Sequence, residues 1–181
     1  MICVIFAETG LAAGFFFPGD SLLVIAGLFA AKGDLSMPIM LSTLTVAAIA
    51  GDAVGYLTGA KLGKRLFTRP KSLLFRPSHL QHAHAFYERY GNKTIIMARF
   101  VPIVRTFAPI VAGAADMPYG KFVMYNIVGG AGWVFSMLLT GYFLGSVIPN
   151  LDKNIEKLAA VVIFLSLLPP LFEYLKSRKK T

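Results

Sequence analysis

Long runs of apolar residues, separated by short polar connections, dominate the pattern along this chain. Three of the runs are long enough to cross a bilayer as helices: 39–60, 122–148 and 155–175. A helix that rises 1.5 Å per residue needs roughly 20 residues to span a hydrocarbon core of about 30 Å, and each run reaches that length. The pattern therefore predicts an all-α integral membrane protein.

Two further apolar runs, 1–31 and 94–115, contain residues that interrupt a helix. Proline removes a backbone donor from the helical ladder. The expected breaks are Pro18, Gly19, Pro102 and Pro109. Non-helical backbone at membrane depth is tolerated where protein buries it or where it lines a wet cavity, so we expect two re-entrant hairpins. A signal peptide in the first run is disfavoured, because a basic leading region and a small-residue cleavage site are both missing.

Composition and charge support this interpretation. The chain is 56% hydrophobic and 15% charged, whereas soluble domains have about 45–50% and about 25%. The net charge is +9, and basic residues concentrate in 61–93 and in 176–181. Such blocks beside apolar runs favour lipid headgroups over nucleic acid as the partner. By the positive-inside rule, both blocks lie in the cytoplasm, which fits alternating crossings and a cytoplasmic C-terminus.

The basic linker 61–93 carries its own helical pattern. Ser78 can cap a helix that Gly91 ends. One face of this helix is apolar, through Leu80, Ala83, Phe86, Tyr87 and Tyr90. We expect an amphipathic helix in the cytoplasmic interface. The histidines at 79, 82 and 84 are poorly spaced for one metal site, so we interpret them as solvated surface and predict neither a metal nor a cofactor.

The chain also shows an internal repeat. Ala26-Gly27 recurs as Ala112-Gly113, and the run at 55–59 recurs at 141–145, both with an offset of 86. A re-entrant hairpin returns to the side of the membrane from which it entered, whereas a crossing ends on the opposite side. A unit of one hairpin and one crossing therefore changes sides, so the second unit would be inverted, as in many transporters. The predicted organisation is a single membrane domain, 1–175, followed by a basic tail: hairpin 1–31, crossing 39–60, linker 61–93, hairpin 94–115, crossing 122–148, crossing 155–175 and tail 176–181.

Glycines spaced four apart form a smooth face on the first crossing. They are Gly51, Gly55, Gly59 and Gly63. Small residues at this spacing let helix backbones approach closely, so we expect a helix-packing surface with no chemical role.

Few ionisable residues lie inside the apolar runs, and such residues are functional candidates by default. They are Glu8, Asp20, Asp52, Arg99 and Arg105. Arginine offers a planar, always-charged fork suited to phosphate, and apolar surroundings favour the protonated form of a carboxylate. If the two hairpins face each other, the acids of the first hairpin lie opposite the arginines of the second, and the charges are complementary. The alternative is a set of structural salt bridges that hold the hairpins together.

Several motifs in this order resemble the DedA family of bacterial inner-membrane proteins, whose domain also occurs in eukaryotic lipid scramblases. They are FAETGL at 6–11, FPGDSLL at 17–23, GDAVGY at 51–56 and ARFVPIVRT at 98–106, continued by 109–113, Met117 and Gly132-Trp133. The resemblance covers nearly the whole chain. Family members usually carry a longer segment before the ETG motif, whereas seven residues precede Glu8 here.

The resemblance implies a fold and a function. The fold is a pair of opposed re-entrant hairpins in the plasma (inner) membrane. The function is transport of a phosphorylated lipid, notably the return of undecaprenyl phosphate, coupled to the proton-motive force. Arg99 and Arg105 would bind the phosphate, and Glu8 and Asp20 would couple protons. The sequence does not distinguish a monomer from a homo-oligomer.

Two other function classes were weighed. The first alternative is a non-transporting scaffold that assists membrane-protein assembly. An integral-membrane lipid phosphatase would need catalytic histidines near its arginines, but all three histidines lie in 61–93. We therefore expect a transporter and not an enzyme.

Overall fold

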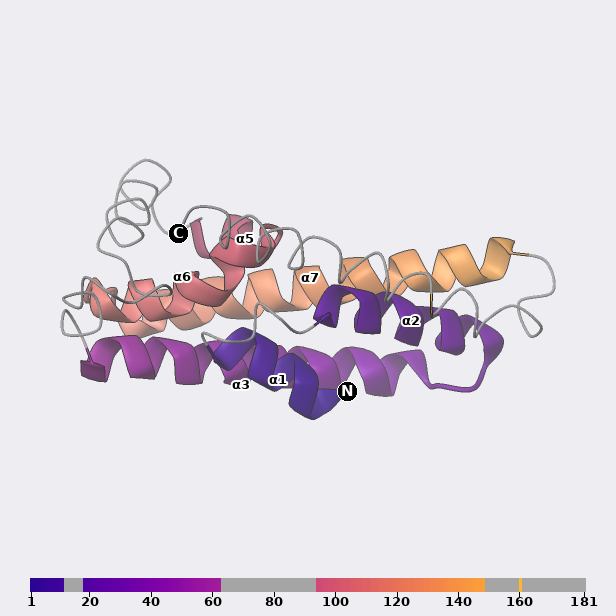
Figure 1. Ribbon diagram of the computed structural model, residues 1–181, viewed down its shortest axis with the longest axis horizontal. Helices are drawn as coiled ribbons and strands as arrows, with labels where there is room; N and C mark the ends of the chain where they lie inside the picture. The colour runs from indigo at the N-terminus through magenta and orange to yellow at the C-terminus, as the bar shows by residue number, and fades with distance from the viewer. Residues whose placement is uncertain (12–17, 63–93, 149–159, 161–181) are drawn as a thin grey trace, which may run out of the picture.

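The computed structural model describes residues 1–11, 18–62 and 94–148, together with residue 160, and every element in this part is a helix (Figure 1). The helices are α1 (Ile2–Gly10), α2 (Gly19–Lys32), α3 (Met37–Leu62), α5 (Thr94–Ala98), α6 (Pro102–Ala114) and α7 (Tyr119–Val147). The two longest, α3 and α7, run along the length of the molecule, and the shorter helices pack against them.

Of the described helices, α3 and α7 are long and apolar enough to cross a membrane, with 26 and 29 residues. They contain most of the expected crossings 39–60 and 122–148. The linker beyond Leu62, where we expect an amphipathic helix and where the histidines lie, is outside the described residues, as are Gly63 and the tail 176–181. The third crossing, 155–175, also lies outside them apart from residue 160.

The first broken run forms two short helices, α1 and α2. Helix α1 ends at Gly10, well before the expected break at Pro18, and Leu11 is extended with φ −107° and ψ 136°. Gly10 packs tightly on α3, because a Cβ there would lie 2.8 Å from the Gly51 carbonyl oxygen. Helix α2 begins directly after Pro18.

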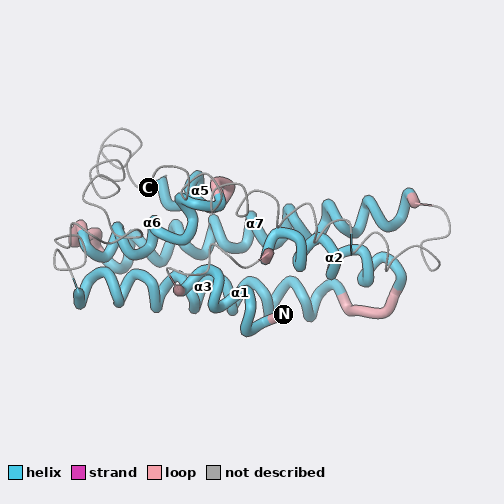
Figure 2. The backbone as a smooth tube through the Cα atoms, in the orientation of Figure 1, coloured by secondary structure: helices cyan, strands magenta, loops and turns pink. Residues whose placement is uncertain are grey.

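A tight loop then joins α2 to α3 (Figure 2). Gly33 ends α2 with φ +89°, a left-handed conformation that glycine adopts without steric cost.

In the second broken run, the predicted break at Pro109 is wrong. Pro109 lies inside α6, which is continuous from Pro102 to Ala114, and the interruption falls in the turn before Pro102. Proline suits the first turn of a helix, where the amide would be unpaired in any case. At Pro109 the helix gives up one backbone hydrogen bond, and the ring packs against α3, where a Cβ at Gly55 would lie 3.3 Å from Pro109 Cβ.

Glycines bring the shorter helices close to the two long ones. Gly27 of α2 packs on Gly141 of α7, since a Cβ at Gly27 would lie 2.9 Å from Gly141 Cα. Gly113 of α6 packs on α3 near Gly59, since a Cβ at Gly113 would lie 2.7 Å from the Ala60 nitrogen. Each broken run thus places its second helix on the long helix of the other half. The inverted repeat itself stays a prediction.

Apolar side chains cover the outside of the long helices as well as their contacts. The inner cluster includes Ile5, Leu23, Leu44, Trp133 and Leu138, all nearly inaccessible. Large apolar side chains also point outward along α3 and α7, including Ile39, Val46, Val128, Phe143 and Val147. Large apolar side chains exposed along helices of this length are typical of contact with lipid.

Candidate functional site

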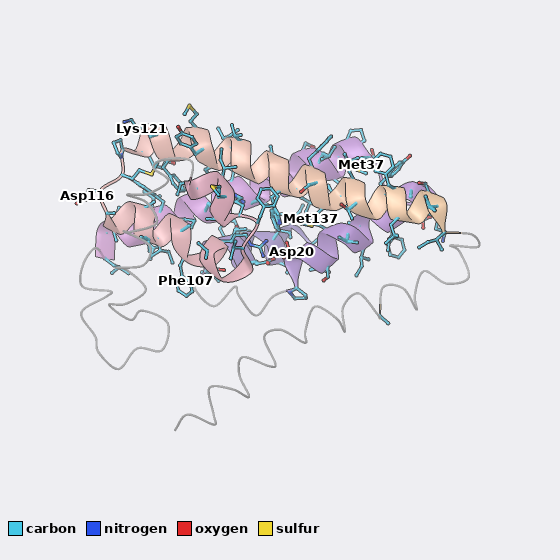
Figure 3. The ribbon with its side chains drawn as sticks, turned by 90° about the horizontal axis from the view of Figure 1, so that it is seen from above. Asp20, Met37, Phe107, Asp116, Lys121 and Met137 are labelled. Carbon is cyan, nitrogen blue, oxygen red and sulfur yellow. The ribbon has the colours of Figure 1, made fainter. Side chains whose placement is uncertain are left out.

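Five charged side chains meet between these helices. Glu8 comes from α1, Asp20 from α2 and Asp52 from α3, while Arg105 comes from α6 and Arg99 from the turn after α5. Figure 3 shows Asp20 about midway along the bundle. They form two groups, which we call the Arg105 site (Arg105, Glu8, Asp20 and Trp133) and the Arg99 site (Arg99, Asp52 and Asn126).

In the Arg105 site, one arginine binds two carboxylates. Arg105 Nη1 donates to Asp20 Oδ1 at 2.8 Å, and Nη2 donates to Glu8 Oε1 at 2.5 Å. Trp133 contacts both Arg105 and Asp20. Its Nε1 donates a hydrogen bond to Asp20 Oδ1 at 2.8 Å, and its ring lies 4.5 Å from Arg105 Cζ. The Asp20 side chain is 38% exposed, whereas that of Arg105 is 4% exposed. The Arg105 site is therefore buried except at Asp20.

The Arg99 site is closed on all sides. Arg99 Nη2 donates to Asp52 Oδ2 and to Asn126 Oδ1. The side chains of Arg99 and Asp52 are 2% and 3% exposed. Asn126 is fixed in turn, because its Nδ2 donates to the Ile49 carbonyl oxygen at 3.1 Å. Among the residues that the structure describes, Asp52 is thus an acid whose one direct ionic partner is the buried Arg99.

Small residues and one hydroxyl position these side chains. Arg99 lies along two glycines of α7, because a Cβ at Gly130 would lie 3.2 Å from its Nη2 and one at Gly129 would lie 3.6 Å from its Cδ. The Glu8 carboxyl occupies the space that a side chain at Gly19 would need. Next to Glu8, the Thr9 hydroxyl lies 3.3 Å from the Ala48 carbonyl oxygen and so ties α1 to α3.

Comparison with known proteins places this arrangement in a family. Residues 17–143 match the VTT domain. The chain is 45% identical to Protein DedA of Escherichia coli (strain K12), over 99% of this chain and 82% of that protein. The chain belongs to the DedA family. It is also 34% identical to Inner membrane protein YqjA of the same strain, over 91% of this chain and 74% of that protein.

Another relative is an uncharacterised membrane protein of Mycobacterium tuberculosis (strain ATCC 25618 / H37Rv), 39% identical over 94% of this chain and 75% of that protein. No solved structure matches the chain. The relatives' names and the two candidate spans together identify this DedA family protein as a membrane protein.

Several buried polar atoms of the two sites have no hydrogen-bond partner in the described part of the chain. They are Arg99 Nε, Arg99 Nη1, Arg105 Nε, Asp52 Oδ1 and Glu8 Oε2. Unpaired polar atoms are rare inside proteins and call for an explanation. Here they leave both arginines with donors available to a further oxyanion.

The structure divides the residues that the sequence singled out. It brings Arg105 together with Glu8 and Asp20, but it gives Arg99 separate partners. Sequence reasoning marked Asp52 as ionisable and assigned it no role. It missed Asn126 altogether, although a polar amide inside the apolar run 122–148 could have marked this residue as a candidate. It noted Trp133 only as part of a family motif.

Proposed function

We propose that this DedA family protein carries a phosphorylated lipid across the membrane and that Arg105 and Arg99 bind the headgroup phosphate. The observation that carries the proposal is a buried arginine whose partner Asp20 is 38% exposed, which gives an anion a route to its guanidinium. Arginine pairs with phosphate through charge-assisted, often bidentate hydrogen bonds. The family resemblance favours undecaprenyl phosphate, returned for reuse, as the substrate.

Proton coupling follows from competition for the same donors. A phosphate that binds Arg105 takes over the hydrogen bonds that Glu8 and Asp20 now accept. A carboxylate that loses its cation in apolar surroundings favours its protonated form. Binding of phosphate and uptake of protons are then linked, and linkage is reciprocal. A proton gradient can therefore drive the transport, with Glu8 and Asp20 as the coupling acids.

The proposed membrane arrangement is multi-pass, with the two broken runs as opposed re-entrant hairpins. Its support is the reciprocal packing of α2 on α7 and α6 on α3, together with the basic linker and tail. In a Cys3→Ser background, cysteines placed at Ser72 and Ser177 are expected to resist a membrane-impermeant thiol reagent added outside the cell. Labelling at either position contradicts this topology.

Transport is tested with purified protein in vesicles that contain labelled undecaprenyl phosphate. We expect the wild type to move the label between leaflets, and Arg105→Lys and Arg99→Lys to fail, because a point charge does not replace a planar fork. Lys32→Gln, outside both sites, is the matched control and is expected to retain transport. Release of inorganic phosphate would indicate a phosphatase, and neither signal would favour a scaffold.

Coupling has its own test in the same vesicles. An imposed pH gradient should accelerate transport by the wild type. The acceleration should disappear in Glu8→Gln or in Asp20→Asn while lipid binding persists. If both variants keep full acceleration, neither acid couples protons and this part of the proposal is wrong.

A further inference from the structure

Arg99 is held in place by contacts that do not involve Asp52. Asn126 of α7 accepts a hydrogen bond from Arg99 Nη2 and is itself anchored on the Ile49 carbonyl oxygen. The stem and the guanidinium lie against Gly129 and Gly130. The position of Arg99 is therefore set by α7, and Asp52 approaches it from α3 as a separate partner.

The Arg99–Asp52 pair is incompletely satisfied on both sides. Arg99 Nε and Nη1 and Asp52 Oδ1 are buried and have no hydrogen-bond partner in the described part of the chain. A single carboxylate oxygen uses only one of the guanidinium nitrogens. A tetrahedral oxyanion with several oxygens could occupy more of these donors than Asp52 does.

Charge balance limits what can bind there. With every group ionised, Arg99 and Arg105 give +2, and Glu8, Asp20 and Asp52 give −3, so the net charge is −1. A phosphate dianion would make it −3. Protonation of Glu8 and Asp20 alone returns the net charge to the −1 of the empty sites, but it leaves Asp52 without the Arg99 that the phosphate occupies, so Asp52 must be protonated as well. Uncompensated charge in a low-dielectric interior is strongly disfavoured.

Within residues 1–11, 18–62 and 94–148, the surroundings of Asp52 supply no other cation that could replace Arg99. Arg105 of α6 lies within electrostatic reach of Asp52 but is bound to Glu8 of α1 and Asp20 of α2. From α7 comes the neutral amide of Asn126, while Lys121 of that helix is exposed. Asp52 therefore depends on Arg99 to remain charged.

We propose that Arg99 forms an inner anion site in which Asp52 is the resident counter-ion, and that a lipid phosphate displaces Asp52, which takes up a proton as it leaves. The proton comes from the aqueous phase and returns there when the phosphate departs. This inference rests on the proposed function, and it adds a third proton-carrying acid to Glu8 and Asp20. It also explains why Arg99 keeps unused donors.

The test measures proton uptake and lipid binding together on the purified full-length protein in detergent. A short-chain polyprenyl phosphate is added in weakly buffered solution that contains a pH indicator. Binding is followed by fluorescence, because Trp133 is the single tryptophan of the sequence and lies in the Arg105 site. Asp52→Asn is compared with Asp34→Asn, which removes an acid that is 46% exposed and lies outside both sites.

We expect Asp52→Asn to take up about one proton fewer per bound lipid than the wild type, because one titrating group has been removed. Asp34→Asn should match the wild type. Unchanged uptake by Asp52→Asn that still binds the lipid overturns the inference and leaves the proposed function standing. Absence of lipid binding by the wild type instead overturns the proposed function.

Infrared difference spectroscopy keeps the inference testable if Asp52→Asn does not fold. Addition of the lipid to the wild type should produce a band from a newly protonated carboxyl group. In Asp52→Glu, which keeps a titratable group at this place, part of that band should shift. A band that is identical in the two proteins would originate from Glu8 or Asp20 and would overturn the role of Asp52.

Discussion

The Arg105 site and the Arg99 site use the same kind of side chain in two different settings. Arg105 contacts two acids from separate helices, and one of them, Asp20, is 38% exposed. Arg99 contacts one acid that is 3% exposed, and a neutral amide takes the place of a second acid. The comparison teaches that burial of the partner decides what an arginine in a membrane protein can do. An exposed partner such as Asp20 can be hydrated when it loses its arginine, whereas a buried one such as Asp52 has to take up a proton as it leaves.

The largest expected effect is on stability and comes from removing one arginine at a time. Arg99→Met leaves Asp52 buried without its cation, and loss of one partner from such a pair costs about 3–5 kcal/mol. Arg105→Met should cost a similar amount, because it leaves Glu8, whose side chain is 2% exposed, without its cation, even though Asp20 can be hydrated. The free energy of unfolding in detergent measures both. The double variant Arg99→Met/Asp52→Leu should recover much of the loss, and a purely additive double variant would show that the pair is not coupled.

A smaller effect is expected from Trp133, which belongs to the Arg105 site alone. Trp133→Phe keeps a ring beneath Arg105 but removes the Nε1 hydrogen bond to Asp20. We expect this to lower the free energy of unfolding by roughly 2 kcal/mol. The lipid affinity of Trp133→Phe, measured by direct binding of labelled lipid, should fall. Trp133→Phe keeps a ring for Arg105 to stack on, whereas Trp133→Leu removes it, so the lipid affinity of Trp133→Leu should be lower still. Equal affinities of all three proteins would show that Trp133 only fills space.

Gly130 probes the Arg99 site with a change of one methyl group. In Gly130→Ala the new Cβ would lie 3.2 Å from Arg99 Nη2, so Arg99 must shift, and we expect a loss of about 1 kcal/mol in stability together with slower transport. Gly132→Ala is the matched control on the same helix, because a Cβ there meets nothing within 4 Å. That control should be neutral or slightly stabilising. If both variants transport more slowly, the effect comes from adding a side chain anywhere on this part of α7 and not from moving Arg99.

The smallest effect belongs to the surface pair of Lys32 and Asp34. Their side chains lie 3.3 Å apart and are 32% and 46% exposed. Asp34→Asn should change the stability by less than about 0.5 kcal/mol, and salt should reduce the difference further. A larger change, measured by the same unfolding assay, would mean that exposed charges matter more in this protein than the comparison assumes.

The sequence by itself determined the helical class, the long helices and the candidate chemistry. Apolar runs of sufficient length located α3 and α7, because bilayer thickness sets a minimum length that any crossing must reach. Charges inside those runs are costly, so the acids and arginines at the site were visible without coordinates. Pro102 is the first residue of α6, where a proline fits the first turn, and Pro18 lies directly before α2.

Only the tertiary structure decided which of these residues meet. Both the lipid-facing and the protein-facing sides of α3 and α7 are apolar, so the pattern along the chain does not reveal which side packs. For the same reason, the pairing of Asp52 with Arg99 and the roles of Asn126 and Trp133 were not predictable. Pro109 was wrongly predicted to be a break. It is accommodated inside α6, where its ring packs against Gly55 of α3, and this contact is visible only in the tertiary structure. The glycine spacing on α3 predicted that a helix would pack closely there. Which helices meet on that face, and so which charged residues come together, depends on the surfaces of two helices and is not encoded by the spacing within one.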